Sequence, residues 1–442
     1  MQLTARFFAL FSFVAIVLAT ERAHAQSTGD PPAPPAEPAP PAEPATPVEA
    51  AEPAQPVEPT PPSTEPAQPA QPATTKPENN LVAKGSLSVA GYLDTVATTV
   101  LTPSIGGSVE NPIAGWGING RYLLDVVSAA SPDIVSTASP PFKELRQGGT
   151  LGGRYKPGNF GVGGSFNASY SPDYLALSGS LQLTEDLNDK NLTLFQSYSY
   201  GHDTIGRARV PFSTFSRSLD THAVTLGLSS VVNSALVLGF SADAIFEDGD
   251  QSKPYRYIPM FSRADAARIQ PGASVDTIAD LRIQARPLEQ LPLSRQRFAG
   301  TGRLAWRFDR STLRVEQRGY ADSWGLGAAT TDARYFIDTS ERVSIWPHVR
   351  FHVQNAVSFW QRVYGIDGYR ALPALRTSDR ELGPLWTAGF GGGLRLALGR
   401  AGRVDDIVWT TTLDGFYTSF SDTIYVTERL SGLLTTGLEV TF

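Results

Sequence analysis

Long stretches of alternating apolar and polar side chains run from about residue 84 to the C-terminus, separated by turns rich in Gly, Asn, Asp, Ser and Pro. Alternation at period two predicts β-strands with one apolar and one polar face. Residues 343–354 show it most clearly. One face there is apolar, with Val343, Ile345, Pro347, Val349, Phe351 and Val353, and the other is polar, with Ser344, His348, Arg350, His352 and Gln354.

A soluble β-sandwich also alternates, so further features must separate it from a transmembrane β-barrel. The stretches are long, as tilted membrane crossings require, and aromatic residues gather near their ends, at Phe359, Trp360, Tyr417, Phe420 and Tyr425. No later segment approaches eighteen consecutive apolar residues, so a closed barrel is the remaining way to cross a membrane. The last strand ends at Phe442, which resembles the C-terminal assembly signal of outer-membrane barrels.

The connections predict how many strands the barrel has. Short turns and longer loops alternate, as they do between the periplasmic and extracellular ends of such barrels. Counting back from a periplasmic C-terminus, the parity is even only if a break near Asp94 makes two strands of residues 84–109. We therefore expect an all-β fold: an antiparallel transmembrane barrel of about sixteen strands over residues 84–442. The expected long loops are residues 201–218, 248–293, 322–332 and 359–383.

The N-terminus indicates export. Arg6 precedes the apolar residues 7–18, and Ala23 and Ala25 occupy the small-residue positions of a cleavage site. We expect a signal peptide over residues 1–25; the alternative, an uncleaved anchor helix, needs a longer apolar run. The sequence contains no cysteine, which excludes disulfides, thiolate chemistry and a lipidated cysteine anchor.

Residues 26–83 form a proline-rich segment that repeats Pro, Ala and Glu. Proline removes backbone donors and fixes φ, so we expect a disordered, extended periplasmic spacer without a core. The alternative is a ligand for the cell wall or a periplasmic protein. The formal net charge of −6 and the pI near 5.5 give no global basic field, so nucleic acid is not an expected partner.

Two tandem octets follow the strand that contains Trp116 and Tyr122. They begin at Asp125 and Asp133, share the pattern Asp-x-x-Ser-x-Ala-Ser, and differ only at their second and fifth positions. With residues 142–146, 190–194, 254–256 and 320–325, and with Pro292, Arg295 and Arg297, they resemble a bacterial outer-membrane family catalogued as a domain of unknown function. The resemblance covers about residues 85–442 and excludes the proline-rich segment. It implies a large outer-membrane barrel and brings no substrate, cofactor or catalytic residue.

The strand count places the doubled octet at the extracellular mouth. Its candidate residues, Asp125, Ser128, Asp133 and Ser136, have oxygen atoms that can coordinate a cation or hold a loop in the lumen. The alternative is a capped turn, because Asp and Ser bond readily to nearby backbone amides. Calcium requires more oxygen ligands than this stretch guarantees, so no metal and no cofactor is predicted.

Six arginines fall on the expected water-facing side of four successive strands: Arg303, Arg307, Arg314, Arg318, Arg334 and Arg350. A cationic lumen wall favours anions. The interleaved acids Glu316 and Asp338 leave open a second interpretation, in which salt bridges fill and brace a closed barrel. His348 and His352 lie about 13 Å apart on one strand, too far to share a metal.

Residues 248–293 are too long for an idle connection, and we expect a short helix near residues 264–269. This loop either folds into the lumen and narrows it or lies at the surface as a lid. No histidine stands in a nucleophile motif, so no catalytic residue is predicted and we do not expect an enzyme. The sequence favours a channel or transport barrel for small polar or anionic solutes, with outer-membrane lipid and the barrel-assembly machinery as partners. The alternative is a structural or partner-docking barrel without an open pore.

Overall fold

The computed structural model describes residues 81–131, 136, 142–207, 209–252, 254, 256–367, 372–402 and 404–442. The expected signal peptide and all of the proline-rich segment before residue 81 lie outside these residues, as does Asp133. Among the described residues, no helix has the length and apolar character that a membrane crossing requires.

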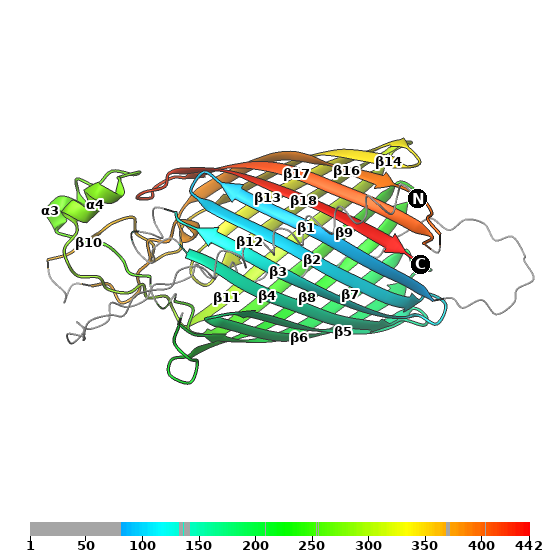
Figure 1. The fold of residues 1–442 in the computed structure, drawn as a ribbon, viewed down its shortest axis with the longest axis horizontal. Helices are drawn as coiled ribbons and strands as arrows, with labels where there is room; N and C mark the ends of the chain where they lie inside the picture. The colour runs from blue at the N-terminus through cyan, green and yellow to red at the C-terminus, as the bar shows by residue number, and fades with distance from the viewer. Residues whose placement is uncertain are drawn as a thin grey trace, which may run out of the picture. The chain divides into compact units, whose positions relative to one another are not determined.

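Sixteen antiparallel strands close into a barrel, which confirms the predicted fold and strand count (Figure 1). Each strand pairs with its neighbours in chain order, and β1 pairs with β18. The strands are β1 (Val82–Asp94), β2 (Thr98–Asn111), β3 (Trp116–Ala129), β4 (Phe142–Tyr155), β5 (Phe160–Ser171), β6 (Tyr174–Leu187), β7 (Leu192–Ile205), β8 (Arg217–Asn233), β9 (Leu236–Gly249), β11 (Ser294–Arg307), β12 (Ser311–Asp322), β13 (Gly327–Ser340), β14 (Val343–Gln354), β16 (Leu385–Ala397), β17 (Asp406–Phe420) and β18 (Glu428–Thr441).

The two ends of the barrel differ. At the end where β1 begins and β18 ends, here called the terminal end, the connections are short, as at residues 156–159, 308–310 and 341–342. At the opposite end, here called the far end, the connections include residues 206–216, 250–293 and 355–384. The long connections therefore lie at one end, as predicted, although other far-end turns, such as residues 95–97 and 172–173, are as short as those of the terminal end.

One predicted long loop is wrong. Residues 322–332 were expected to form a loop, but β12 continues to Asp322 and β13 begins at Gly327, which leaves a four-residue turn. The carboxylate of Asp322 accepts the backbone N–H groups of Trp324 and Leu326 at 2.9 Å each, and Gly325 takes a positive φ of 87°. These bonds make a tight turn where the polar sequence had indicated a longer one.

The strands present an apolar surface outward and a polar surface inward. Phe298 and Phe351 are exposed on the outer face, whereas Thr301 and His348, on the inner face of the same strands, are buried. On the outer face, Trp386 lies between Phe351 and Tyr417, with ring centroids 6.3 and 5.4 Å apart, as in an aromatic girdle.

The other aromatic residues assigned to a girdle pack elsewhere. Phe359 and Trp360 pack against a buried cluster around Trp324, and Phe420 is buried beside Val96 and Leu385. Their position near strand ends therefore reflects loop packing rather than contact with a membrane interface.

Three far-end loops, residues 250–293, 355–384 and 421–427, pack together into what we call the cap. Within it, β10 (Met260–Phe261) pairs in parallel with β15 (Tyr364–Gly365), and the short elements are α3 (Arg263–Ala266), α4 (Val275–Leu281) and η2 (Arg380–Leu382). The helix expected near residues 264–269 is confirmed as α3, and α4 was not predicted.

The cap has an apolar core of its own. Phe261, Ile269 and Ile278 are buried against Ile424 from the third loop, and Met260 packs with Tyr364. The helices α3 and α4 lie beyond the strand ends (Figure 1). Of the two arrangements expected for residues 248–293, the helical part therefore corresponds to a lid rather than to a loop folded down into the lumen.

Candidate functional site

All six predicted arginines lie on one face of β11, β12, β13 and β14. Side chains of directly paired residues in an antiparallel sheet point to the same side. Arg303 pairs with Glu316, Arg318 pairs with Thr301, which is buried on the inner face, and Arg334 pairs with both Arg314 and His348. The alternation along each strand then places Arg307 and Arg350 on this inner face as well.

Five ion pairs follow this face from the terminal end to the far end, and we call them the ion-pair ladder. The pairs, with their N···O distances, are Arg307–Asp338 at 2.8 Å, Arg303–Glu316 at 2.7 Å, Arg318–Asp243 at 2.9 Å, Arg297–Glu247 at 2.9 Å and Arg295–Asp322 at 2.5 Å. Of the two interpretations left open by the sequence, these pairs correspond to the salt-bridged wall rather than to a uniformly cationic one, because β9, β12 and β13 supply carboxylates at matching heights.

The remaining predicted arginines have different neighbours. Arg334 and Arg350 both lie near Asp332, at 3.4 and 3.5 Å. Arg314 stacks over the ring of Phe336, 4.9 Å from its centroid, and among the described residues it has no carboxylate within ion-pair distance. Of the six predicted arginines, Arg314 is therefore the one whose positive charge is least compensated.

His348 and His352 do not act together. The imidazole of His348 lies between two carboxylates, 2.8 Å from Asp332 and 2.6 Å from Asp414, whereas His352 contacts the hydroxyl of Thr330 at 2.8 Å. The two histidines are separate parts of the inner face.

Solvent exposure changes steadily along the ladder. From the terminal end to the far end, the exposed fraction of the arginine side chains falls through 49, 45, 36, 20 and 12%, and that of their acidic partners through 36, 32, 17, 7 and 0%. Inward-facing side chains that keep nearly half of their surface accessible border water-filled space. The ladder is therefore accessible to water near the terminal end. Near the cap, neighbouring side chains cover the ion pairs and exclude water from them.

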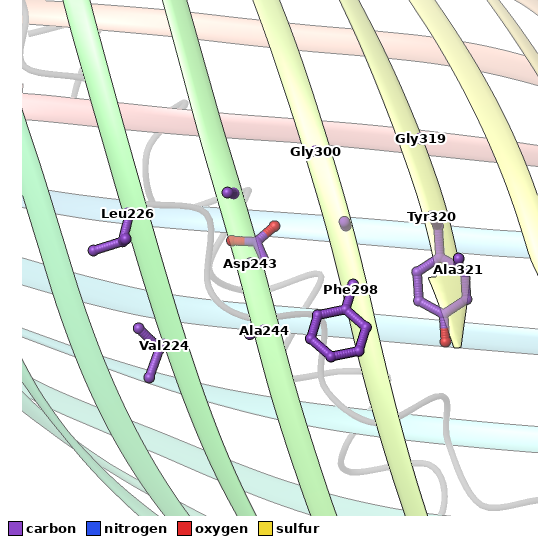
Figure 2. A pocket seen from close by; sticks show the side chains of 11 residues that line it. Val224, Leu226, Asp243, Ala244, Phe298, Gly300, Gly319, Tyr320 and Ala321 are labelled. Atoms are coloured by element: carbon purple, nitrogen blue, oxygen red, sulfur yellow. The ribbon is translucent and has the colours of Figure 1, made fainter. Parts of the chain in front are cut away.

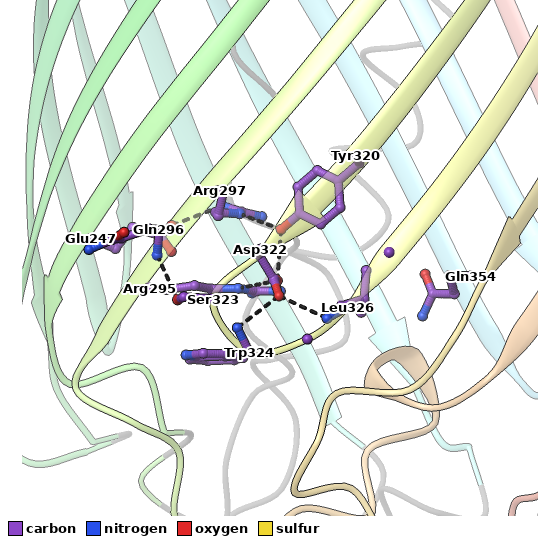
Figure 3. Close-up of polar contacts among 12 residues, drawn as sticks. Glu247, Arg295, Gln296, Arg297, Tyr320, Asp322, Ser323, Trp324, Leu326 and Gln354 are labelled. Carbon is purple, nitrogen blue, oxygen red and sulfur yellow. Dashed lines mark hydrogen bonds and ion pairs between the residues drawn. The ribbon is translucent and has the colours of Figure 1, made fainter.

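The far end of the ladder joins the cap through Asp322 (Figure 3). Asp322 accepts from Arg295 and from the hydroxyl of Tyr320 at 2.9 Å, while the guanidinium of Arg295 lies 4.1 Å from the ring centroid of Trp324. Trp324 is buried in a cluster with Leu291 and Val357 of the cap. One packed unit thus connects the last ion pair of the wall to the loops above it.

The inner face of β4 to β6 also contains small neutral groups. These groups hydrogen-bond to each other across the strands: Ser165 with Ser180 at 2.8 Å, Thr150 with Asn167 at 2.7 Å, and Asn167 with Ser178 at 3.3 Å. We call this the hydroxyl wall. The lining of the lumen therefore includes a neutral region besides the ion-pair ladder.

Of the mouth motif, the described residues Asp125 and Ser128 lie in a strand rather than in a turn. They are at the far end but inside β3, which pairs with β4 as far as Ala129. Alternation puts them on opposite faces of the strand; Asp125 accepts from Thr102 at 2.6 Å and lies 3.7 Å from Arg146. The carbonyl of Ser136 accepts from the Tyr257 hydroxyl at 2.5 Å, which ties this loop to the cap. Since Asp125 and Ser128 diverge, they cannot share one cation.

Sequence reasoning missed two groups of residues. Arg295 and Arg297 continue the inner register of β11, so extending the alternation toward residue 294 would have found them. On the outer face, His202 and Asp220 lie 2.8 Å apart across β7 and β8. The sequence had placed His202 in the expected loop of residues 201–218, whereas β7 continues to Ile205 and pairs His202 with Asp220 of β8.

A family model described as "Protein of unknown function (DUF3570)" matches residues 67–405. The chain belongs to this family. The match confirms the resemblance to a family of unknown function and differs from the expected range at both ends. The DUF3570 match begins inside the proline-rich segment and ends just before β17.

The DUF3570 chain is similar to several solved structures at low sequence identity. CdiB from Acinetobacter baumannii is 10% identical, with a TM-score of 0.42, over 81% of this chain and 60% of its own. The outer membrane protein OprD from Pseudomonas aeruginosa is 8% identical, with a TM-score of 0.39, over 82% and 94%. A BenF-like porin from Pseudomonas fluorescens Pf-5 is 8% identical, with a TM-score of 0.39, over 82% and 99%. The search of curated proteins gave no match.

Proposed function

We propose that this DUF3570 protein is an outer-membrane channel that admits small polar or anionic solutes, with its terminal end in the periplasm. The exposure gradient along the ion-pair ladder carries the proposal. A barrel whose interior served only as a braced core would bury its charged pairs throughout, whereas Arg307 and Arg303 keep 49 and 45% of their side-chain surface accessible. The cap then controls access at the extracellular end.

Arg314 provides the test of selectivity. Arg314→Gln removes one uncompensated positive charge and leaves no carboxylate without its partner. One unit charge about 8 Å from a permeating ion in water changes the local concentrations of anions and cations about twofold in opposite directions, so the anion-to-cation permeability ratio should fall about fourfold. Reversal potentials in planar bilayers under a salt gradient measure the ratio. Arg268→Gln, which deletes the same charge on the exposed surface of the cap, should leave it unchanged.

A second candidate function, a structural or docking barrel without an open pore, is favoured by the apolar core of the cap and by the buried far-end pairs. A variant whose residues 251–291 are replaced by a Gly-Ser linker separates the two. Stable conductance steps in this variant, with few in the intact protein, support a channel that the cap closes. If neither protein shows stable steps while both remain folded, the channel proposal is wrong and the structural function stands.

A further inference from the structure

The outer face of β8, β9, β11 and β12 contains a shallow groove of about 570 Å³ (Figure 2). Its floor consists of small residues, because Ala242, Ala244, Gly300, Gly319 and Ala321 all face outward there. Val224 and Leu226 border it on one side, and Phe298 stands beside the floor. Elsewhere on this face large apolar side chains fill the surface, so the groove is a local gap in the outer apolar layer.

A cluster of polar side chains lies beside the groove, on the outer face of β7 and β8. The hydroxyl of Tyr200 donates to Asp220 at 2.6 Å, His202 contacts the same carboxylate oxygen at 2.8 Å, and the hydroxyl of Tyr198 lies 2.8 Å from His222. His202 and Asp220 remain 46 and 38% exposed. We call these five residues the polar cluster.

The strand register fixes where the cluster lies relative to the groove. Tyr198, Val224, Ala244, Phe298 and Ala321 form one row across the strands. Toward the far end, another row contains His202, Asp220, Asp248 and Ser294. Asp248 is four residues from Ala244 and six from Ala242, which is about 13 to 20 Å along β9. This distance is close to the depth of one leaflet, about 15 Å of hydrocarbon.

Charge determines what the polar rows can bind. The row that contains His202 has two carboxylates, Asp220 and Asp248. The outer faces of β7, β8 and β9 carry no Lys or Arg. A headgroup with only negative charge would be repelled, whereas a primary ammonium complements the carboxylates. Tyr hydroxyls and imidazole N–H groups supply donors for a phosphate.

We propose that the groove and the polar cluster form a binding site for one acyl lipid that has both a phosphate and a primary ammonium in its headgroup, with phosphatidylethanolamine as the test lipid of this chemistry. An acyl chain occupies the groove, and the ammonium lies against Asp220 and Asp248. The inference rests on the proposed membrane location of the barrel and is independent of whether the lumen is open. A failed conductance test therefore leaves it intact, and its own failure leaves the channel proposal intact.

Native mass spectrometry of the purified full chain, incubated with phosphatidylethanolamine, phosphatidylcholine or phosphatidylglycerol, tests the site. We expect one phosphatidylethanolamine to remain bound at collision energies that strip the other two. Equal retention of all three lipids would show that the polar cluster is an ordinary interfacial band, and preferential retention of phosphatidylglycerol would contradict the assigned headgroup.

Filling the groove with larger side chains tests whether it binds the acyl chain. An added Cβ at Gly300 or Gly319 meets no atom within 4 Å, so the double variant Gly300→Leu, Gly319→Leu should fold normally. We expect it to lose the retained lipid. Gly432→Leu on β18, which is equally unobstructed and lies away from the groove, should retain it. Equal retention in both variants overturns the groove assignment.

Removing the carboxylate tests the headgroup site. Asp220→Asn should lower the preference for phosphatidylethanolamine over phosphatidylglycerol by about fivefold, the size expected for one exposed ion pair. Glu185→Gln, which removes an outward carboxylate near the terminal end of β6, is the matched control and should leave the preference unchanged. An unchanged preference in Asp220→Asn shows that this carboxylate does not bind the headgroup.

Discussion

At the scale of single residues, Asp322 holds the far end of the ladder together. Its buried carboxylate accepts from Arg295, from Tyr320 and from two backbone N–H groups of the turn that follows β12. Removing one partner of a buried ion pair leaves the other charge without compensation and costs about 3–5 kcal/mol.

Asp322→Ala should therefore lower the free energy of unfolding by about 3–5 kcal/mol, measured by urea unfolding of the barrel in lipid vesicles. Asp338→Ala removes the acid from the most exposed pair of the ladder and should cost less than about 1 kcal/mol. Similar losses in the two variants would contradict the burial gradient from which the wet interior is inferred.

The sequence predicted which way the arginine side chains point, but not all of the residues that they contact. Alternation alone was enough to put six arginines on one face, because side-chain direction in a strand depends only on parity. The sequence also named two of the acidic partners, Glu316 and Asp338, but the contact of Arg318 with Asp243 depends on the register of strands 75 positions apart in sequence. The sequence could therefore not decide between a cationic wall and a salt-bridged one.

At the scale of elements, the cap is held by Tyr364 of β15. Its hydroxyl donates to the carbonyl of Thr377 at 3.0 Å and accepts from the Thr377 N–H at 2.9 Å. Burial raises the pKa of Tyr364 from 10.0 to about 12. Because the folded cap holds the neutral phenol more tightly than the unfolded loop does, this contribution is complete below pH 10 and is lost as the pH rises to about 12.

We therefore expect alkaline loosening of the cap while the barrel strands stay paired. Limited proteolysis of the cap, followed across this pH range beside circular dichroism of the sheet, measures the two separately. In Tyr364→Phe the part of the transition due to this phenol should disappear, although the variant starts from a less stable cap because it lacks the hydroxyl. A pH profile identical to that of the unchanged protein would contradict this assignment.

Phe442 belongs to the seam between β18 and β1. Its N–H donates to the carbonyl of Ala83 at 2.8 Å, and its carbonyl accepts from the Ala83 N–H at 3.4 Å. Deleting Phe442 removes both bonds and an exposed aromatic side chain, so the fraction of heat-modifiable barrel in membranes should fall. Phe442→Tyr keeps the ring and the backbone and should assemble normally. Normal insertion of the deletion would show that Phe442 is not an assembly signal.

The cap itself was beyond sequence reasoning. The strands could be counted because apolar and polar side chains alternate along them, but residues 250–293 have no such alternation. The apolar core of this loop forms only with residues 355–384 and 421–427. The apolar residues that build it, such as Phe261 and Ile424, are separated by more than 150 positions in the chain.

At the scale of the whole molecule, we propose that the proline-rich segment is a periplasmic tether that barrel folding does not need. Deleting residues 30–78 should leave heat modifiability and membrane fractionation unchanged, because such a composition cannot bury a core. If the segment binds the cell wall or a periplasmic protein, only co-sedimentation with that partner should change. A barrel that fails to assemble without the segment would refute the tether, provided that a variant with the same residues in scrambled order assembles.

The two linings of the barrel interior have a consequence for any solute inside it. Guanidinium and carboxylate groups lie side by side in each pair of the ladder, while the hydroxyl wall across β4 to β6 offers neutral hydrogen bonds without a fixed sign. In the proposed channel, a zwitterion orients its two charges against an ion pair of the ladder, whereas a sugar of similar size exchanges hydrogen bonds with either wall and rotates. Such an interior sorts solutes by dipole moment as well as by net charge.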